Sequence, residues 1–303
     1  MTVVLAGGSG FLGRKLAARL ASEGHTTITL SRRPSGDGSQ IAWQPDGNPG
    51  ALSRHLDGVD AIVNLAGEGI ADKRWSEARK NALWSSRILS TRTLVRAVAG
   101  CAKPPKVFIS GSGVGYYGAH GDEPVTESTA PGTDFLSRLC VEWEQEARLV
   151  ESPSTRLAIV RTGLALDRDG GALKKMLLPF KLGLGATLAS GDQYMPWIHV
   201  DDWTALVSWL IQNGRATGAF NAAAPQPVTN RAFTQALARV LHRPALFHAP
   251  AFVLRVAIGE LASALVDGQR ALPAAAEQHG FRFTHRTLEP ALEGLNLRVA
   301  TGR

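Results

Sequence analysis

An apolar stretch close to the start of the chain runs directly into a glycine-rich turn and then into a helical pattern. Residues 3–6 read Val-Val-Leu-Ala, glycines follow at positions 7, 8, 10 and 13, and leucines recur at helical spacing from Leu12 to Leu20. A strand that turns sharply into a helix leaves the first N–H groups and the positive dipole end of that helix facing the turn, where they suit phosphate groups. Glycines let the backbone make the turn, approach a diphosphate and pack the helix against the strand. We therefore predict a dinucleotide cradle, with a tight turn that binds no ligand as the alternative. The cradle residues are Gly7, Gly8, Ser9, Gly10, Phe11, Leu12 and Gly13.

Length, composition and charge place the chain among ordinary globular proteins. The 303 residues suit one large or two modest domains, and 44% of them are hydrophobic and 19% charged. No apolar run reaches membrane-spanning length and no basic leader precedes the first strand, so we expect a cytoplasmic protein with no membrane partner. The net charge of +7 is spread along the chain rather than gathered in a tail, so no nucleic-acid partner is expected. Two cysteines are too few for a disulfide framework, and no metal site is expected.

Strand-like and helical patterns alternate through the first half of the chain. Strands are expected at residues 3–6, 26–31, 61–66, 107–110 and 157–161, separated by helices at 11–23, 75–99 and 134–150. This alternation predicts an α/β fold with a doubly wound parallel sheet. We place a boundary at residue 163, between a cofactor domain at 1–163 and a smaller mixed α/β substrate lobe at 164–303, although later chain is free to return to the sheet. The apolar segment from Pro250 to Val266 is expected to be a helix packed inside this lobe.

The end of the second strand indicates which dinucleotide the cradle prefers. In such a cradle an acid at this point binds the ribose 2′-hydroxyl of NAD, whereas an arginine accommodates the 2′-phosphate of NADP. The chain reads Ser31-Arg32-Arg33, and the nearest acid, Asp37, follows only after Pro34 and Gly36. We therefore predict NADP(H), with two arginines that merely open a solvated loop as the alternative.

Several further motifs, in the right order, resemble the extended branch of the short-chain dehydrogenase/reductase superfamily. Within this branch the chain is similar to an atypical group of epimerase-family proteins with a short C-terminal domain of their own, at about residues 248–297. The motifs are residues 7–13, 60–68, 71–75, 115–118, 161–163, 197–202, 250–252 and 280–283. The resemblance implies a Rossmann domain, a substrate between the lobes and possible homodimers through the helices at 75–99 and 134–150. It also implies cofactor contacts from Ser31, Arg32, Leu65, Ala66, Gly67 and Arg87.

The acid/base residues of this chain differ from those of the superfamily. Its enzymes typically use a tyrosine as acid/base, with a lysine four residues later and a serine that holds the reacting oxygen. No tyrosine here is followed by such a lysine, and Leu136 and Cys140 take the two positions. Ser112 remains, four residues before Tyr116. The candidate catalytic residues are therefore Ser112, Tyr116 and Tyr117, and each has a local packing role as its alternative.

The leading hypothesis is an NADP(H)-dependent oxidoreductase acting on a small, non-nucleotide substrate. The alternative is an NADP(H)-binding sensor or interaction protein without turnover, which the loss of the tyrosine–lysine pair favours. A sugar-nucleotide epimerase is disfavoured, because Met195 stands where that class often has an arginine on the diphosphate. Asp201 and Asp202 precede an apolar helix and are expected to cap it rather than to bind a metal with His199.

Overall fold

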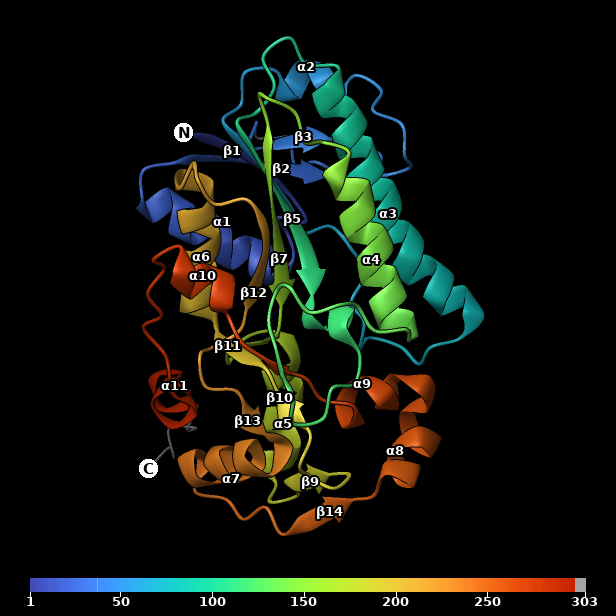
Figure 1. Ribbon diagram of the computed structural model, residues 1–303, viewed down its shortest axis with the longest axis vertical. Coiled ribbons are helices and arrows are strands. Elements are labelled where there is room, and N and C mark those ends of the chain that lie inside the picture. The colour runs from blue at the N-terminus through green and yellow to red at the C-terminus, as the bar shows by residue number, and fades with distance from the viewer. Residues whose placement is uncertain (37, 298–303) are drawn as a thin grey trace. The chain divides into compact units, whose positions relative to one another are not determined.

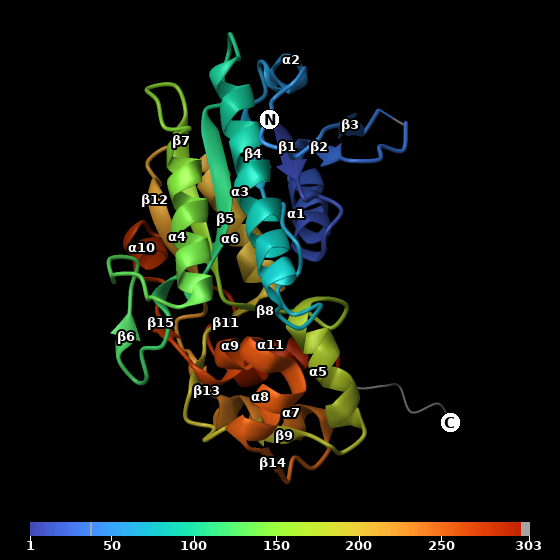
Figure 2. The ribbon, with the colours of Figure 1, turned by 90° about the vertical axis from the view of Figure 1, so that its right-hand side faces the viewer.

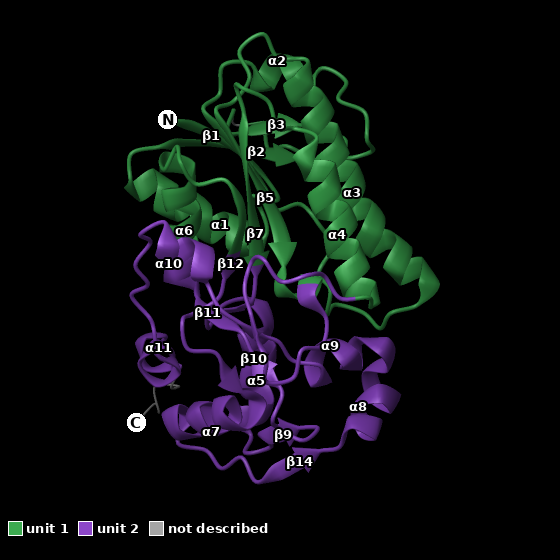
Figure 3. Ribbon diagram, in the orientation of Figure 1, with its two compact units in different colours: residues 1–116, 133–161, 204–220 green, residues 117–132, 162–203, 221–303 purple. Residues whose placement is uncertain are grey.

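The computed structural model describes residues 1–36 and 38–297, so Asp37 lies outside the described residues. Clustering of contacts divides the chain into two units, coloured separately in Figure 3. The first comprises residues 1–116, 133–161 and 204–220, and the second comprises residues 117–132, 162–203 and 221–303. The division into a cofactor domain at 1–163 and a substrate lobe at 164–303 stays a prediction. The return of the chain to the sheet after that point is observed, because residues 218–222 form an outer strand.

A seven-stranded sheet organises the first unit, in the order β12-β7-β5-β4-β1-β2-β3. Its pairs from β3 to β5 are all parallel, with Val3 opposite Thr27 on one side and Ala61 on the other. The predicted doubly wound α/β fold is therefore confirmed. The strands are β1 (Thr2–Ala6), β2 (Thr26–Ser31), β3 (Gln40–Ala42), β4 (Ala61–Asn64), β5 (Val107–Gly113), β7 (Arg156–Thr162) and β12 (Gly218–Ala222).

Helices cover both faces of this sheet. Figures 1 and 2 show α1 and α6 on one face and α3 and α4 on the other. The apolar runs of β1 and β4 are fully buried, as expected for parallel strands covered on both faces. The strand order reverses between β1 and β4, and ligands of such sheets bind at the carboxyl ends of the strands at this switch point. The helices are α1 (Phe11–Ser22), α2 (Leu52–Leu56), α3 (Glu77–Ala99), α4 (Phe135–Arg148) and α6 (Val200–Gln212), and a 3-10 turn, η1, spans Val114–Tyr117.

The second unit consists of short strands and helices around its own core. Phe233 and Leu237 of α7 pack there with Leu173 of α5 and Leu292 of α11. Its strands pair two by two, as β8–β11, β9–β14, β6–β15 and β10–β13. They are β6 (Pro124–Val125), β8 (Leu164–Leu166), β9 (Ala186–Leu188), β10 (Tyr194–Met195), β11 (Trp197–His199), β13 (Val228–Thr229), β14 (Phe247–Ala249) and β15 (Arg270–Ala271). The helices are α5 (Gly171–Lys181), α7 (Asn230–Leu241), α8 (Ala251–Ile258), η2 (Gly259–Ala262), α9 (Ser263–Val266), α10 (Ala274–Gln278) and α11 (Leu288–Gly294).

The expected buried helix from Pro250 to Val266 was wrong on two points. The segment forms three short helical pieces, because Gly259 adopts a φ of 65° and breaks the helix. No residue of α8, all of which lie in the described part of the chain, is buried. Apolar composition alone cannot tell a buried helix from one that turns its side chains outward. Among residues 1–36 and 38–297, no helix combines the length and hydropathy needed to cross a bilayer.

Candidate cofactor site

The glycine turn between β1 and α1 is packed too closely for side chains. Gly7 has a φ of +82°, and a Cβ atom there would lie 2.7 Å from the Leu65 carbonyl carbon at the end of β4. A Cβ atom on Gly13 would lie 2.2 Å from the Gly7 oxygen. Both contacts are to backbone, which cannot rotate away as a side chain can. The glycine pattern therefore joins β1, β4 and α1 as the sequence predicts.

The N-terminus of α1 is left without a side-chain cap. Ser76 caps α3 and Asp134 caps α4, each accepting a hydrogen bond from a backbone N–H of its helix. The corresponding residue of α1 is Gly10, and no described side chain accepts a hydrogen bond there. The first turn of α1 also contains no acid. Its N–H groups and its dipole therefore favour an anion, such as a diphosphate.

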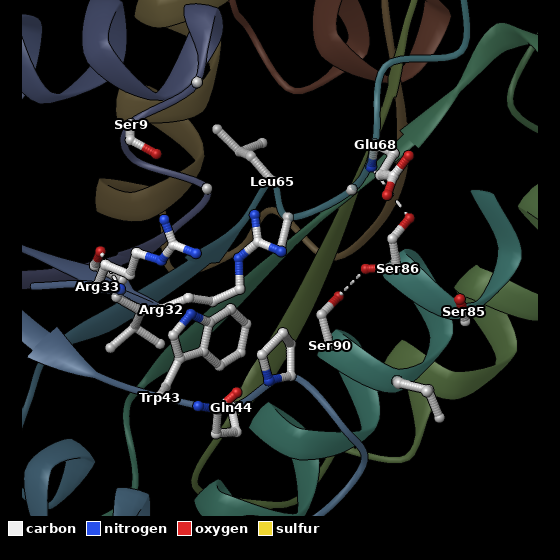
Figure 4. A pocket seen from close by; sticks show the side chains of 18 of the residues that line it. Ser9, Arg32, Arg33, Trp43, Gln44, Leu65, Glu68, Ser85, Ser86 and Ser90 are labelled. Carbon is white, nitrogen blue, oxygen red and sulfur yellow. Dashed lines mark hydrogen bonds between the residues drawn. The ribbon is translucent and has the colours of Figure 1, made fainter. Parts of the chain in front are cut away.

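A groove of about 890 Å³ lies beside this turn, a size that suits a large ligand. Figure 4 shows its wall, which is formed by the ends of β1, β2 and β4, by the segment after β3 and by one face of α3. The predicted residues that line the groove are Gly7, Ser9, Gly10, Ser31, Arg32, Leu65, Ala66 and Gly67. Gly8 and Gly13 instead serve the packing of the turn, and Phe11 and Leu12 belong to the first turn of α1.

Two arginines at the end of β2 extend over the groove. The Arg33 N–H donates to Ser31 Oγ at 3.1 Å, which fixes the backbone as it leaves the strand. Figure 4 shows the Arg32 and Arg33 guanidinium groups between Trp43 and Leu65. Planar guanidinium groups bind phosphate through paired hydrogen bonds. This end of the groove is therefore suited to a second anionic group.

The sequence predicts α3 as a helix, but it did not indicate that one face of α3 forms a wall of the groove. Four small residues and one leucine on α3 line the groove at helical spacing, so the helix backbone can lie close to a ligand. The spacing of one turn between them is a signal that the sequence contained. These residues are Ala82, Ser85, Ser86, Leu89 and Ser90. Trp43, Gln44 and Pro45 were also missed, because nothing in the local sequence indicates that the segment after β3 turns toward the sheet edge.

Arg87 lies behind the groove wall. It donates from Nη1 to the Leu83 carbonyl at 3.1 Å and from Nη2 to the Glu68 carbonyl at 2.9 Å. Burial lowers the pKa of this guanidinium, which packs against Gly67 and over the Trp143 ring. Arg87 therefore supports the loop after β4, and its direct contact with a cofactor stays a prediction.

Ser112 belongs to a buried polar network. Its hydroxyl donates to Glu144 Oε1 at 2.7 Å, and Arg161 donates to both oxygens of that carboxylate, each at 2.8 Å. The Arg161 and Glu144 side chains are each only 3% exposed. The Arg161 guanidinium also lies 3.4 Å from the centre of the Tyr116 ring. Because a serine has one hydroxyl hydrogen, Ser112 is set here to accept a hydrogen bond from a further group rather than to donate one.

The Tyr117 hydroxyl, a second candidate, is buried in the second unit. Tyr117 is fully buried, and its hydroxyl donates to Asn221 Oδ1 at 2.7 Å. Asn221 in turn donates from Nδ2 to the Leu272 carbonyl at 2.9 Å, and its backbone N–H donates to Glu127 Oε1 at 2.8 Å. This arrangement favours a packing role for Tyr117, and its catalytic role stays a prediction.

The two positions that hold the tyrosine and lysine in related enzymes carry no acid/base group. A Cβ atom on Gly115 would lie 3.2 Å from Leu136 Cβ, so Leu136 packs closely on the loop after β5. Burial, together with the nearby Glu144 carboxylate, raises the pKa of the Cys140 thiol to about 11. Cys140 is therefore a neutral thiol at physiological pH, buried in the packing between α4 and β5.

The acids at the start of α6 do not all act as predicted. Both lie in the first turn, where the helix dipole favours them. The Asp202 carboxylate, however, accepts hydrogen bonds from the backbone N–H groups of Thr284 and His285, at 2.9 and 2.7 Å. It thus ties the C-terminal segment to α6 instead of capping the helix. The sequence could not show this, because the partners lie more than 80 residues away.

His199, Asp201 and His285 bring possible metal ligands together, with their atoms within 4.8 Å of one another. The two imidazole rings are stacked, with centroids 3.8 Å apart and planes 19° from parallel. A metal binds in the plane of an imidazole, and nearly parallel planes do not converge on one ion. In this arrangement the two rings pack on each other and do not share one ion, and the absence of a metal site stays a prediction.

Comparisons with known proteins match both parts of the chain. The family model described as "NAD dependent epimerase/dehydratase family" matches residues 3–223, and a domain of unknown function, DUF1731, matches residues 249–295. An epimerase family protein of Mycobacterium bovis is 41% identical over 292 residues, covering 96% of each chain. YfhF of Bacillus subtilis, also an epimerase family protein, is 37% identical and covers 97% of this chain and 98% of its own.

A solved structure agrees in fold. The crystal structure of the human epimerase family protein SDR39U1 with NADPH is 34% identical, has a TM-score of 0.91, and covers 97% of this chain and 99% of that one. The match of the family model over most of the chain, the matching C-terminal domain and these full-length relatives agree. The chain therefore belongs to the NAD dependent epimerase/dehydratase family, as a member with a C-terminal DUF1731 domain.

Proposed function

We propose that this protein binds NADP(H) in the groove and is an oxidoreductase for a small, non-nucleotide substrate. The observation that carries the proposal is the pairing of an uncapped helix N-terminus with Arg32 and Arg33 at the other wall of one groove. The first suits a diphosphate and the second a 2′-phosphate. The structure of the human relative with NADPH supports the same choice of cofactor. NADP(H), when bound, would supply hydride exchange.

The residues of this chain would bind and orient rather than move a proton. The turn at Gly7 and Gly10 would hold the diphosphate, and Leu65 to Gly67 would lie along the adenosine half. Ser112, whose hydroxyl donates its hydrogen bond to Glu144, would accept a hydrogen bond from a hydroxyl or an N–H of a bound group. A substrate that presents such a donor, an alcohol or an amide, fits this serine better than a bare carbonyl.

Titration of the protein with NADPH and NADH, followed by nucleotide fluorescence, tests the cofactor. Arg32→Glu should raise the Kd for NADPH by about tenfold or more, since a charge-assisted hydrogen bond contributes about 1.5–3 kcal/mol. It should change NADH binding little. Arg54→Glu, the same charge change at an exposed residue of α2, is the matched control. No binding of NADPH at millimolar concentration, or equal affinity for NADH, would refute the proposal.

A second candidate is a cofactor-binding sensor without turnover. The buried, neutral Cys140 and the packed Leu136 favour it, because the acid/base pair is missing. NADPH oxidation across a panel of carbonyl substrates, and NADP reduction across a panel of alcohols, separates the two. Turnover that Ser112→Ala reduces supports the oxidoreductase, whereas saturable binding with no turnover on either panel supports the sensor.

A further inference from the structure

The second unit presents apolar side chains outward on and beside α8. Phe252 is 68% exposed and Val256, one turn later, is 75% exposed. Leu246, directly before β14, is 86% exposed, and Phe247, the first residue of β14, is also exposed. β14 leads through Pro250 into α8, as Figures 1 and 2 show. We call the exposed apolar residues of this region the α8 surface: Leu184, Leu246, Phe247, Phe252, Val253 and Val256.

These side chains belong to adjoining segments rather than to scattered positions. The Phe247 N–H donates to the Gly185 carbonyl, so Leu184 and Leu246 flank one backbone contact. β9 and β14 continue from that contact as a parallel pair. Single exposed apolar residues are normal on a protein, but a group of this kind marks a contact site.

The two segments that contribute the α8 surface have a net positive charge. Residues 171–188 contain three lysines, Lys174, Lys175 and Lys181, and residues 242–258 contain Arg243 and Arg255. Neither segment contains an aspartate or a glutamate, and the first acid after α8 is Glu260. Exposed apolar side chains with an excess of cations over acids are typical of surfaces that bind anionic lipid bilayers, and Glu260 of the adjoining η2 is the acid that offsets this excess.

We propose that the α8 surface docks the protein onto an anionic lipid bilayer. Phe252, Val253 and Val256 would enter the headgroup region, with Arg255 and its neighbours beside lipid phosphates. A second copy of the chain fits less well, because a two-fold contact would bring the same cations together on both sides. The sequence predicts no membrane partner on the ground that nothing spans a bilayer, and peripheral docking requires no spanning segment. The proposal does not depend on the cofactor.

Vesicle flotation of the full chain tests the proposal. We expect the protein to float with vesicles of phosphatidylcholine mixed with phosphatidylglycerol, to float poorly with phosphatidylcholine alone, and to be released by added salt. The double variant Phe252→Ser/Val256→Ser should bind about tenfold more weakly or worse, because two large apolar side chains would no longer enter the headgroup region. Leu149→Ser, at an apolar side chain of the first unit that is 70% exposed, is the matched control and should bind as the unchanged protein does.

Several results would overturn the proposal, including binding of a second copy of the chain or of a protein partner at the α8 surface. Failure to float with anionic vesicles, or equal flotation of the double variant, would do so. A dimer in light scattering that the double variant dissociates, without vesicle binding, would assign the α8 surface to a second copy. Saturable binding of an acidic protein in place of vesicles would assign it to a protein partner. The Kd for NADPH, measured on the same variants, should stay unchanged, so failure of this proposal is distinct from failure of the cofactor site.

Discussion

Replacement of Arg161 by methionine should destabilise the protein far more than replacement of an arginine at a nearby surface ion pair. Arg161 makes two hydrogen bonds of 2.8 Å to the Glu144 carboxylate, and both side chains are only 3% exposed. Without the guanidinium, the buried carboxylate keeps the Ser112 hydroxyl as its one hydrogen-bond donor among residues 1–36 and 38–297. Breaking a buried pair from one side costs about 3–5 kcal/mol. The lost contact of the guanidinium with the Tyr116 ring adds to this cost.

The control is an ion pair whose carboxylate, Glu146, lies on the same helix, α4, as Glu144. Arg92 pairs with Glu146 at 2.7 Å, but these side chains are 34% and 11% exposed, so Arg92→Met should cost about 0–1 kcal/mol. Urea unfolding followed by tryptophan fluorescence gives both free energies of unfolding. The double variant Glu144→Gln/Arg161→Met should lie closer to the unchanged protein than Arg161→Met does, because no buried charge is left unpaired. If Arg161→Met and Arg92→Met agree within about 1 kcal/mol, the reasoning on burial is refuted.

Three further changes test other parts of the structure. Gly13→Ala forces a Cβ atom to within 2.2 Å of a backbone oxygen, so it should destabilise by about 1–3 kcal/mol and weaken NADPH binding; Gly214→Ala, with no atom within 4 Å, should do neither in urea unfolding or titration. Tyr117→Phe leaves Asn221 Oδ1 without its donor, so it should cost about 1–3 kcal/mol in unfolding while the Kd for NADPH stays the same. Burial, with repulsion from the neighbouring imidazole, lowers the pKa of His199, so the unfolded chain takes up that proton more readily and stability falls as pH drops through about 6.5. His199→Asn should reduce the slope of unfolding free energy against pH, by at most about 1.4 kcal/mol per unit, and an unchanged slope would contradict this.

The features that could be predicted from the sequence are those that depend on neighbours along the chain. The turn at Gly7 to Gly13 is local, since strand, turn and helix follow within a dozen residues. The buried strands were predicted because a parallel sheet requires continuous apolar runs. The arginines at the end of β2 were predicted because position relative to a strand end decides what they face.

The features that were missed depend on residues that are distant in sequence. Glu144 and Arg161 meet only when α4 packs beside β5 and β7, and neither has a local pattern that indicates burial. Asp202 reads as a helix cap, because nothing nearby shows that residues 284 and 285 supply its hydrogen bonds. The outward face of α8 was misjudged for the same reason. Burial is decided by what packs against a helix, and composition does not report that.

The groups available near Ser112 limit the chemistry that this family member can perform. A general acid/base must exchange a proton near neutral pH. The Cys140 thiol stays protonated at that pH, and the hydrogen of Ser112 is held by a carboxylate that is already paired with Arg161. Proton transfer from this network would separate a buried ion pair, which is costly. Turnover would therefore draw its proton from a group outside this network, such as the Tyr116 hydroxyl, the substrate or solvent. The lack of an acid/base group in this network is also what favours the second proposal, a cofactor-binding sensor without turnover.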